Sequence, residues 1–339
     1  MDPLSQASLG AAAAALLARP GQTRRALLVG AFAGAAPDVD VLIKSAEDPL
    51  LQLQYHRHFT HSLLLAPVIG ILVAVMIRWI GFRKEWTVRE LIPFGIAGTL
   101  THGLLDACTS YGTYLYWPFS GHRESWDLIS IIDPLFTLPL VVLLVAAFVR
   151  RQPRLAWIGA SWCLLYFTFG IVQRERAQAF ARSLAESRGH QPTELSVRPS
   201  FANLVVWRLC YRNGDEYHVD AVRALPGTGM RHYPGSSVPV FDLAEAASAA
   251  PTGSTVARDI ERFRAFSQGY LYRVPDRPEV IGDLRYSMFP NSVQPLWGIT
   301  FDPAQTDKHI DMVYFRDPSA RSFRPLWAMI QGRELAVSP

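Results

Sequence analysis

Histidine and aspartate side chains gather at the ends of apolar stretches in the first half of the chain. His102 and Asp106 lie four residues apart, so on a helix both project from the same face and can chelate one cation. His56 and His61 straddle a predicted helix start and can approach one point only if the chain turns between them. Imidazole and carboxylate ligands suit Zn²⁺, and also Mn²⁺ or Fe²⁺. The pattern therefore predicts a site for one or two divalent ions, with zinc as the first choice.

Two further carboxylates, Asp38 and Asp40, follow Pro37 at the end of another apolar stretch. Ionisable groups at the ends of apolar helices are costly unless they are paired, metal-bound or wet. A bound ion lowers the pKa of water to roughly 7 and so enables hydrolysis. We predict that Asp38 acts as the general base and that Arg57 or His58 steadies a developing anion.

Each of these residues also has a purely structural interpretation. Asp38 and Asp40 could form a turn, and His102 could be a hydrogen-bonded histidine inside the helices. Asp106 could cap a helix end, but a carboxylate at a helix C-terminus opposes the helix dipole, which favours a cation partner. Arg57 and His58 could contact lipid headgroups.

The elements that position these groups are apolar and long. A bilayer core of ~30 Å needs about 20 apolar residues in a helix. Four stretches approach this length: Ser62–Ile77, Leu91–Leu105, Pro134–Val149 and Leu155–Val172. Two shorter ones, Ala7–Ala18 and Ala26–Ala36, are expected to form a helical hairpin. Residues 1–172 thus predict an α-helical membrane bundle of about four spans plus an N-terminal hairpin.

Basic residues predict the orientation of this bundle, because loops rich in lysine and arginine stay in the cytoplasm. They fall in three loops: Arg19, Arg24 and Arg25; Arg78, Arg83, Lys84 and Arg89; Arg150, Arg151 and Arg154. The metal-site residues and everything after residue 172 then face the outside of a bacterial inner membrane, with the C-terminal domain in the periplasm.

The second half of the chain reads as an extramembrane domain. Half of the whole sequence is hydrophobic and 18% is charged, with a net charge of +4, which excludes a disordered chain and gives no sign of a nucleic-acid partner. Residues 173–190 predict a linker helix, and residues 191–339 a β-rich (α+β) domain. Its expected strands and helix are Asn203–Arg212, Glu216–Ala224, Leu271–Val274, Asp283–Met288, Leu296–Phe301, Ile310–Phe315 and the helix Thr255–Phe266. The three cysteines are too few and too scattered for a disulfide framework or a thiolate zinc site.

Several motifs resemble the YdjM-like family of bacterial inner-membrane proteins, which are predicted metal-dependent hydrolases. The similar stretches are Asp2–Gln6 with Leu9-Gly10, Gly34–Asp40, His56–Ser62 and His102–Asp106. The likeness covers about residues 1–172, and the stretch 282–286 (Gly-Asp-Leu-Arg-Tyr) is similar to a motif of the longer members.

The resemblance implies a set of metal ligands, and this sequence departs from the family pattern at two positions. The implied ligands are Asp40, His56, His61, His102 and Asp106, with Asp38 close by. His58 stands where the family usually has glycine, which makes it an extra ligand or a substrate contact. Gln6 stands where many members have histidine, so a ligand from the first helix is in question.

These observations lead to three hypotheses. The first is a membrane-bound metal-dependent hydrolase acting on a small amphiphilic substrate, such as a lipid phosphodiester; the site is also distantly similar to zinc-dependent phospholipase C enzymes. The second is a non-enzymatic, metal-stabilised scaffold or receptor whose β-rich domain binds a partner. The third is ion transport, which predicts ionisable residues deeper in the helices, and Ile92–Thr99 and Leu135–Phe148 contain none.

Overall fold

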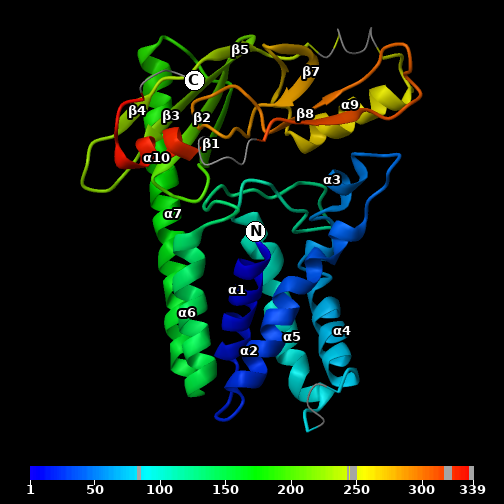
Figure 1. Ribbon diagram of the computed structural model, residues 1–339, viewed down its shortest axis with the longest axis vertical. Helices are drawn as coiled ribbons and strands as arrows, with labels where there is room; N and C mark the ends of the chain where they lie inside the picture. The colour runs from blue at the N-terminus through cyan, green and yellow to red at the C-terminus, as the bar shows by residue number, and fades with distance from the viewer. Residues whose placement is uncertain (82–84, 243, 245–249, 317–322, 336–339) are drawn as a thin grey trace. The chain divides into compact units, whose positions relative to one another are not determined.

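In the computed structural model the first half of the chain is mainly helical, and the second half contains two antiparallel sheets (Figure 1). The structure describes residues 1–81, 85–242, 244, 250–316 and 323–335. The chain divides into two compact units. The first contains Met1–Leu42, Tyr55–Ile171 and Phe201–Asn203, and the second contains Ile43–Gln54, Val172–Ser200 and Leu204–Pro339.

The first unit is built from helices that begin near the predicted positions, and the last of them continues past Ile171 into the second unit. They are α1 (Pro3–Leu16), α2 (Thr23–Ala35), α4 (Ala66–Trp79), α5 (Val88–Ala107), α6 (Pro134–Arg150) and α7 (Pro153–Ser187). Shorter pieces connect them: the 3₁₀ helices η1 (Ala36–Leu42) and η2 (Phe59–His61), and α3 (Leu51–Tyr55). Side chains cap the starts of α1 and α6. Asp2 accepts a hydrogen bond from the Ser5 amide at the start of α1, and Asp133 accepts one from the Phe136 amide at the start of α6.

Glycines bring the backbones of α2, α4 and α5 into direct contact. A Cβ atom added at Gly98 of α5 would lie 2.6 Å from the carbonyl oxygen of Gly30 in α2. One added at Gly95 would lie 2.2 Å from the carbonyl oxygen of Gly70 in α4. No other residue type fits at such distances, and small residues are typical of close helix packing in membranes. The three helices that lead to the predicted metal site are therefore closely packed.

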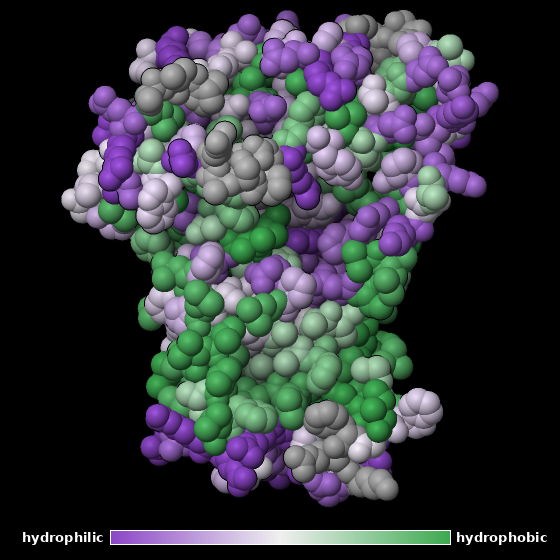
Figure 2. All heavy atoms as spheres, in the orientation of Figure 1, coloured by the Kyte–Doolittle hydropathy of each residue, from purple (hydrophilic) through white to green (hydrophobic). Residues whose placement is uncertain are grey.

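The outer surface of this unit is apolar, as a lipid-facing surface would be. Large hydrophobic side chains are exposed along α4, α6 and α7, among them Val68, Leu72, Val75, Leu138, Val142, Val145, Trp157, Leu164 and Leu165. Figure 2 shows hydrophobic residues gathered over the helices.

One helix of the described chain, α7, is long and apolar enough to cross a membrane by itself. The stretch Leu51–His61 with Ala66–Trp79 passes the same test only if the two parts, bent by 84°, count as one span. The four predicted spans therefore stay a prediction. The last of them and the predicted linker helix form one continuous helix as far as Ser187.

Basic residues near the ends of several helices meet at one end of the unit. Arg24 of α2 donates a hydrogen bond of 2.8 Å to the carbonyl oxygen of Phe148 in α6, and Arg25 pairs with Glu90 of α5 at 3.0 Å. The loops α1–α2, α4–α5 and α6–α7 thus lie at the same end. Two residues of the predicted basic loop, Arg83 and Lys84, lie outside the described residues.

The second unit contains two antiparallel sheets. The first has the order β1-β2-β3-β4 with β5 also paired to β3, and the second has the order β6-β7-β8-β9. The strands are β1 (Glu194–Pro199), β2 (Val206–Asn213), β3 (Glu216–Arg223), β4 (Arg231–Tyr233), β5 (Ser237–Pro239), β6 (Leu271–Val274), β7 (Arg277–Asp283), β8 (Trp297–Thr300) and β9 (Asp311–Tyr314), with the helices α9 (Thr255–Phe266) and α10 (Arg324–Gln331). Asn213 pairs with Glu216, so a two-residue turn with a left-handed Gly214 joins β2 to β3.

The core of this unit joins its two sheets. Cys210 and Val219 of the first sheet belong to one buried apolar cluster with Tyr272 and Val280 of the second. A second cluster packs α10 against the first sheet through Leu326 and Met329. The cysteines Cys108, Cys163 and Cys210 are free.

The predicted strand Asp283–Met288 is wrong. Strand β7 ends at Asp283, and the chain turns at Leu284 and Arg285. The reason is an ion pair between neighbours: the Arg285 guanidinium folds back onto the Asp283 carboxylate with contacts of 2.9 and 2.8 Å, and both side chains are buried. The Arg285 amide also donates a hydrogen bond to the Asp283 carboxylate. In a continued strand, the side chains of residues two apart point the same way, but the carboxylate of the first could not accept from both the guanidinium and the amide of the second. The buried ion pair gives Asp283 and Arg285 a structural role inside the second unit.

A stretch from the first half of the chain belongs to the second unit. We call Ile43–Gln54 the connecting segment, since it joins Asp40 to His56. Arg262 of α9 holds it: its guanidinium contacts both carboxylate oxygens of Asp48 at 3.0 and 2.9 Å, and its Nε donates to Gln54 at 3.0 Å. Burial would raise the pKa of Asp48, but the bonds from Arg262 hold it below its usual value.

Candidate metal centre

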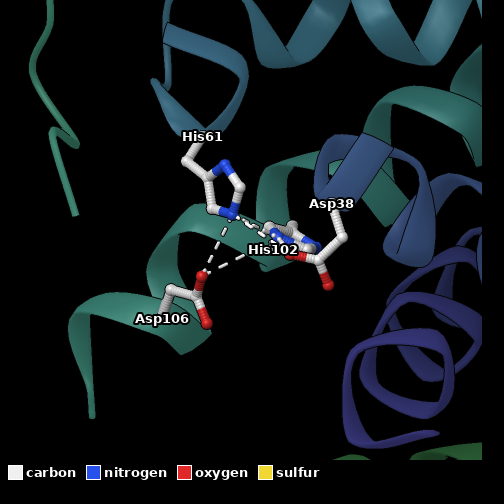
Figure 3. Close-up of side chains that lie close together, drawn as sticks. All are labelled: Asp38, His61, His102 and Asp106. Atoms are coloured by element: carbon white, nitrogen blue, oxygen red, sulfur yellow. Dashed lines mark hydrogen bonds and ion pairs between the residues drawn. The ribbon is translucent and has the colours of Figure 1, made fainter. Parts of the chain in front are cut away.

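Four predicted residues from three separate elements come together at one end of the helices (Figure 3). Asp38 lies in η1 directly after α2, and His61 ends η2 before α4. His102 and Asp106 project from the last turns of α5, on one face as their spacing predicts. The basic loops lie at the opposite ends of these helices, because Arg25 precedes Asp38 by the length of α2 and Glu90 precedes Asp106 by the length of α5.

Gly103 allows this approach. A Cβ atom at this position would lie 2.1 Å from the carbonyl oxygen of His61. A side chain of any size would therefore push the His61 backbone away from α5.

The donor atoms of the four residues surround one small volume. The Nε2 atoms of His61 and His102 lie 2.8 Å apart, and the Asp38 Oδ1 atom lies 3.4 Å from each of them. The Asp106 Oδ2 atom lies 3.2 Å from the His61 Nε2 and 3.8 Å from the His102 Nε2. Tetrahedral Zn²⁺ with bonds of 2.0–2.1 Å places its ligand atoms about 3.3–3.4 Å apart. Three of these five separations lie within about 0.2 Å of this value, and the two Nε2 atoms would have to move slightly apart to bind one such ion.

The outer partners of the two imidazoles fix which nitrogen carries hydrogen. The His102 Nδ1 lies 2.6 Å from the carbonyl oxygen of Gly34, which can only accept, so the Nδ1 must donate. The His61 Nδ1 lies 3.2 Å from the Asp40 carboxylate, which also accepts. Neutral rings of this tautomer present two Nε2 lone pairs to each other, with two carboxylate oxygens around them. Such an arrangement is repulsive unless a cation or a proton occupies the centre.

Asp106 receives further positive and polar partners. Its Oδ2 lies 3.2 Å from the Arg57 Nε, and its Oδ1 accepts a 2.9 Å hydrogen bond from the Gln6 side chain and contacts the amino group of Met1. Arg57 also donates to the Thr109 hydroxyl at 3.0 Å. Gln6 therefore contributes to the site from the first helix through a hydrogen bond to a candidate ligand.

Asp40 and His56 form a second group next to the first. The His56 Nδ1 lies 2.8 Å from the Asp40 Oδ1, while the Asp40 Oδ2 accepts hydrogen bonds from the Arg57 amide at 3.0 Å and from the Thr60 hydroxyl at 2.7 Å. The turn that the spacing of His56 and His61 requires is present. Arg57 has a left-handed backbone (φ 64°), and the rings of His56 and His61 come within 5.8 Å, centre to centre.

Two groups of three or more donors result among the described residues of the first unit, and Asp38 belongs to both. One consists of Asp38, His61, His102 and Asp106, and the other of Asp38, Asp40 and His56; within each group the donor atoms lie within 4.8 Å of one another. A third group, Asp48, Asp259 and His309, lies in the second unit.

Both acidic residues of η1 are ionised at neutral pH. Burial raises the pKa of Asp38, but the His102 and His61 rings beside its Oδ1 outweigh burial and bring the pKa far below its usual value. The pKa of Asp40 is lowered in the same way against the effect of burial, by His56, His61 and Thr60. Both carboxylates are therefore available as acceptors or ligands.

The remaining predicted residues lie around these groups. The His58 ring packs against Tyr114 and Trp117, at 4.5 and 5.8 Å between centres, and it belongs to neither donor group. The Arg57 guanidinium lies 4.7 Å from the ring centre of Tyr111 as well as on Asp106, so it is a buried partner of the site.

Sequence reasoning missed partners for the histidines of the second unit. His309 contacts Asp259 at 2.8 Å and His232 contacts Asp220 at 2.8 Å. Both pairs join residues 12 or more positions apart, and no spacing rule identifies such pairs.

The fold and the site can now be compared with known proteins. A family model described as YdjM inner membrane protein matches residues 1–177, which is more than half of the 339 residues. The chain belongs to the YdjM inner membrane protein family. The YdjM match includes all the residues of both donor groups and Gln6, which confirms the resemblance of the motifs.

Among curated proteins, this YdjM family member is similar to the inner membrane protein YbcI of Escherichia coli (strain K12). The two are 32% identical over 114 residues, which is 32% of this chain and 62% of YbcI. The chain thus spans less than two thirds of that relative. No solved structure matches the chain. The family names identify an inner-membrane protein, and they name no reaction.

Proposed function

We propose that this protein is a membrane-bound metal-dependent hydrolase whose divalent ion is held by Asp38, His61, His102 and Asp106. The observation that carries the proposal is the pair of imidazole nitrogens, 2.8 Å apart, whose outer nitrogens are held by Gly34 and Asp40. Two neutral imidazoles and two carboxylates carry a charge of −2, which a divalent cation balances. Cysteine takes no part, so the donor set favours Zn²⁺, Mn²⁺ or Fe²⁺ bound through nitrogen and oxygen.

The donor residues differ from the set that the family resemblance implies. In this proposal Asp38 is a ligand, and Asp40 is an orienting residue that holds the Nδ1 sides of His56 and His61. Carboxylates that accept from the outer nitrogen of a ligating histidine fix its tautomer and orientation. Such a divalent ion would supply Lewis acidity, polarising a carbonyl or phosphoryl group and making water more acidic.

The protein around the donors favours catalysis over a sealed structural site. His61, His102 and Asp106 are buried, while about a quarter of the Asp38 side chain (24%) remains exposed. The His56 side chain is 23% exposed beside it. Substrate would approach from this side, since the other three donors are enclosed by α5 and its neighbours.

We further propose that the helices cross the membrane about four times and that the site and the C-terminal domain face the periplasm. The three basic loops meet at the end of the helices opposite the donors, and such loops stay in the cytoplasm. A site at the membrane surface suits a small amphiphile, and a lipid phosphodiester is our substrate class. A reporter enzyme that works only in the periplasm should be active when it is fused after Arg176, and one that works only in the cytoplasm should be inactive there.

A non-enzymatic, metal-stabilised scaffold is the second candidate. The observation in its favour is the crowding around Asp106, where Gln6, Arg57 and the Met1 amino group already occupy its oxygens. A proton shared between His61 and the carboxylates would be the metal-free version of this scaffold. Metal content and turnover distinguish these cases.

The test uses full-length protein purified in mild detergent. Elemental analysis should find a divalent transition metal, and the protein should hydrolyse a member of a panel of lipid phosphodiesters. Replacing His102 by glutamine or Asp106 by asparagine should remove both the metal and the activity, whereas His122→Ala, at an exposed histidine outside both groups, should keep both. Full hydrolysis by a metal-free variant would refute the proposal, and a bound metal without hydrolysis of any substrate would favour the scaffold.

A further inference from the structure

The second donor group consists of Asp38, Asp40 and His56 and could also bind a cation. The donor atoms of this group lie within 4.8 Å of one another, as do those of the first group. We propose that the centre holds two divalent cations and that the Asp38 carboxylate bridges them. This inference rests on the proposed function for the first ion, and it adds a second ion held by Asp40 and His56.

The orientation of Asp38 leaves one of its carboxylate oxygens free of the two imidazoles in the first group. Its contacts with His61 and His102 both use Oδ1, at 3.4 Å each. Figure 3 shows the other oxygen pointing away from the two imidazoles. A carboxylate can bind one cation through each oxygen, and two-metal hydrolytic centres hold their ions about 3.5–4 Å apart. One residue that belongs to two donor groups provides this arrangement.

Asp40 has one oxygen left for a cation. Its Oδ2 is occupied by the Arg57 amide and the Thr60 hydroxyl, whereas its Oδ1 contacts the His56 ring at 2.8 Å. This separation is short for two ligand atoms on one ion, so a cation between them would replace the hydrogen bond with a small outward movement. The His56 side chain is only partly buried, at 23% exposed, which leaves room for that movement.

The backbone conformation of Arg57 helps to position the residues of the second group. A left-handed conformation costs a non-glycine residue on the order of 1 kcal/mol. Here it directs the Arg57 amide to Asp40, and the Tyr114 amide donates to the Arg57 carbonyl at 3.0 Å. The turn thereby fixes His56 beside Asp40 and Asp38, and not beside His102.

The two positions differ in burial and should differ in affinity. Three of the four first-group donors are buried, whereas Asp38 and His56 of the second group are both partly exposed. The second ion should therefore exchange faster and be lost first during chelation. The carboxylates of Asp38, Asp40 and Asp106 carry a charge of −3, whereas two divalent ions and the nearby Arg57 would carry +5. The loaded centre would therefore have an excess of positive charge, which suits an anionic substrate.

The experiment is a titration of metal-stripped, full-length protein in detergent with Mn²⁺, followed by calorimetry and electron paramagnetic resonance. The wild type should bind two equivalents and give the signal of two exchange-coupled Mn²⁺ ions. His56→Ala and the milder His56→Gln should bind one equivalent with an uncoupled signal, and Asp38→Asn should weaken both. His122→Ala should bind two coupled ions as the wild type does.

The results separate this inference from the proposed function. One uncoupled equivalent in the wild type would overturn the two-ion centre while the single-ion hydrolase stands. Two equivalents that persist uncoupled in His56→Gln would place the second ion elsewhere and also overturn the inference. The absence of any binding would remove the proposed function itself.

Discussion

Gly103→Ala tests whether the site depends on the backbone contact between α5 and His61. Glycine-to-alanine replacement inside a helix ordinarily stabilises by roughly 0.5–1 kcal/mol, because alanine restricts the unfolded chain and favours the helix. Here the added methyl group would lie 2.1 Å from the His61 carbonyl oxygen and 3.2 Å from both the His61 carbonyl carbon and a methyl group of Leu115. Cβ atoms in proteins keep at least 3.0 Å from such atoms.

The variant should therefore move His61 away from His102. The His61 carbonyl must retreat by about 1 Å, and overpacking of this kind costs about 1–3 kcal/mol. If the strain is relieved by displacing His61, metal affinity falls by the same free energy, which is about 5- to 150-fold. Calorimetric titration with Zn²⁺ and thermal unfolding of the full chain measure the two effects, and both affinity and melting temperature should fall.

The matched control is Gly121→Ala, because nothing lies within 4 Å of a Cβ at Gly121. It should leave metal affinity unchanged. If Gly103→Ala bound Zn²⁺ as tightly as the wild type and melted at a higher temperature, the close contact and the argument built on it would be refuted.

Three further outcomes are expected. Arg262→Ala removes the contacts to Asp48 and Gln54, so limited proteolysis of the full chain should cut the connecting segment (Ile43–Gln54) faster, with about a tenfold higher rate. Asp220→Asn breaks the pair between the buried Asp220 carboxylate and the partly exposed Arg188 guanidinium (2.6 and 3.0 Å) and should cost about 1–3 kcal/mol at pH 7, seen as a lower melting temperature. Bonds from His232 and Arg188 lower the pKa of Asp220 against burial, so its stabilisation is present at neutral pH and lost as pH falls below about 4; the difference between wild type and variant should shrink there. A strong chelator should lower the wild-type melting temperature, since an ion present at about 1,000 times its Kd stabilises by ~4 kcal/mol.

Each outcome has a control. Arg258→Ala, at an arginine of α9 whose bonds are local, should not change proteolysis of the connecting segment. Asp276→Asn, at an exposed turn, should melt like the wild type at every pH. A gap between Asp220→Asn and wild type that widened in acid would contradict the linkage argument, and a chelator without effect on the melting temperature would contradict a resident ion.

The sequence predicted the helical half of the site because its signals are local. Apolar stretches and caps such as Asp133 mark the helices, and a spacing of four places His102 and Asp106 on one face. What it could not predict is which partners Asp38 and Asp40 each contact. Only Val39 separates the two, and the direction in which η1 turns each carboxylate depends on partners from η2 and α5 far along the chain.

The same distinction holds in the second half of the chain. The helix Thr255–Phe266 and the strand Leu271–Val274 were predicted with the observed bounds, since their patterns are regular. Strands β4 and β5 have three residues each and carry no periodic signal. The Asp283–Arg285 pair ended a strand whose apolar pattern continued, because satisfying two buried charges outweighs local propensity.

The connecting segment has a consequence for how this protein can be divided or evolve. Asp40 precedes and His56 follows the connecting segment, whose twelve residues belong to the second unit and bind Arg262. Removing residues 190–339 would remove Arg262 and so leave the connecting segment without these contacts. The positions of Asp40 and His56 would then be less restrained, so the loss of the β-rich half should also affect the candidate metal centre.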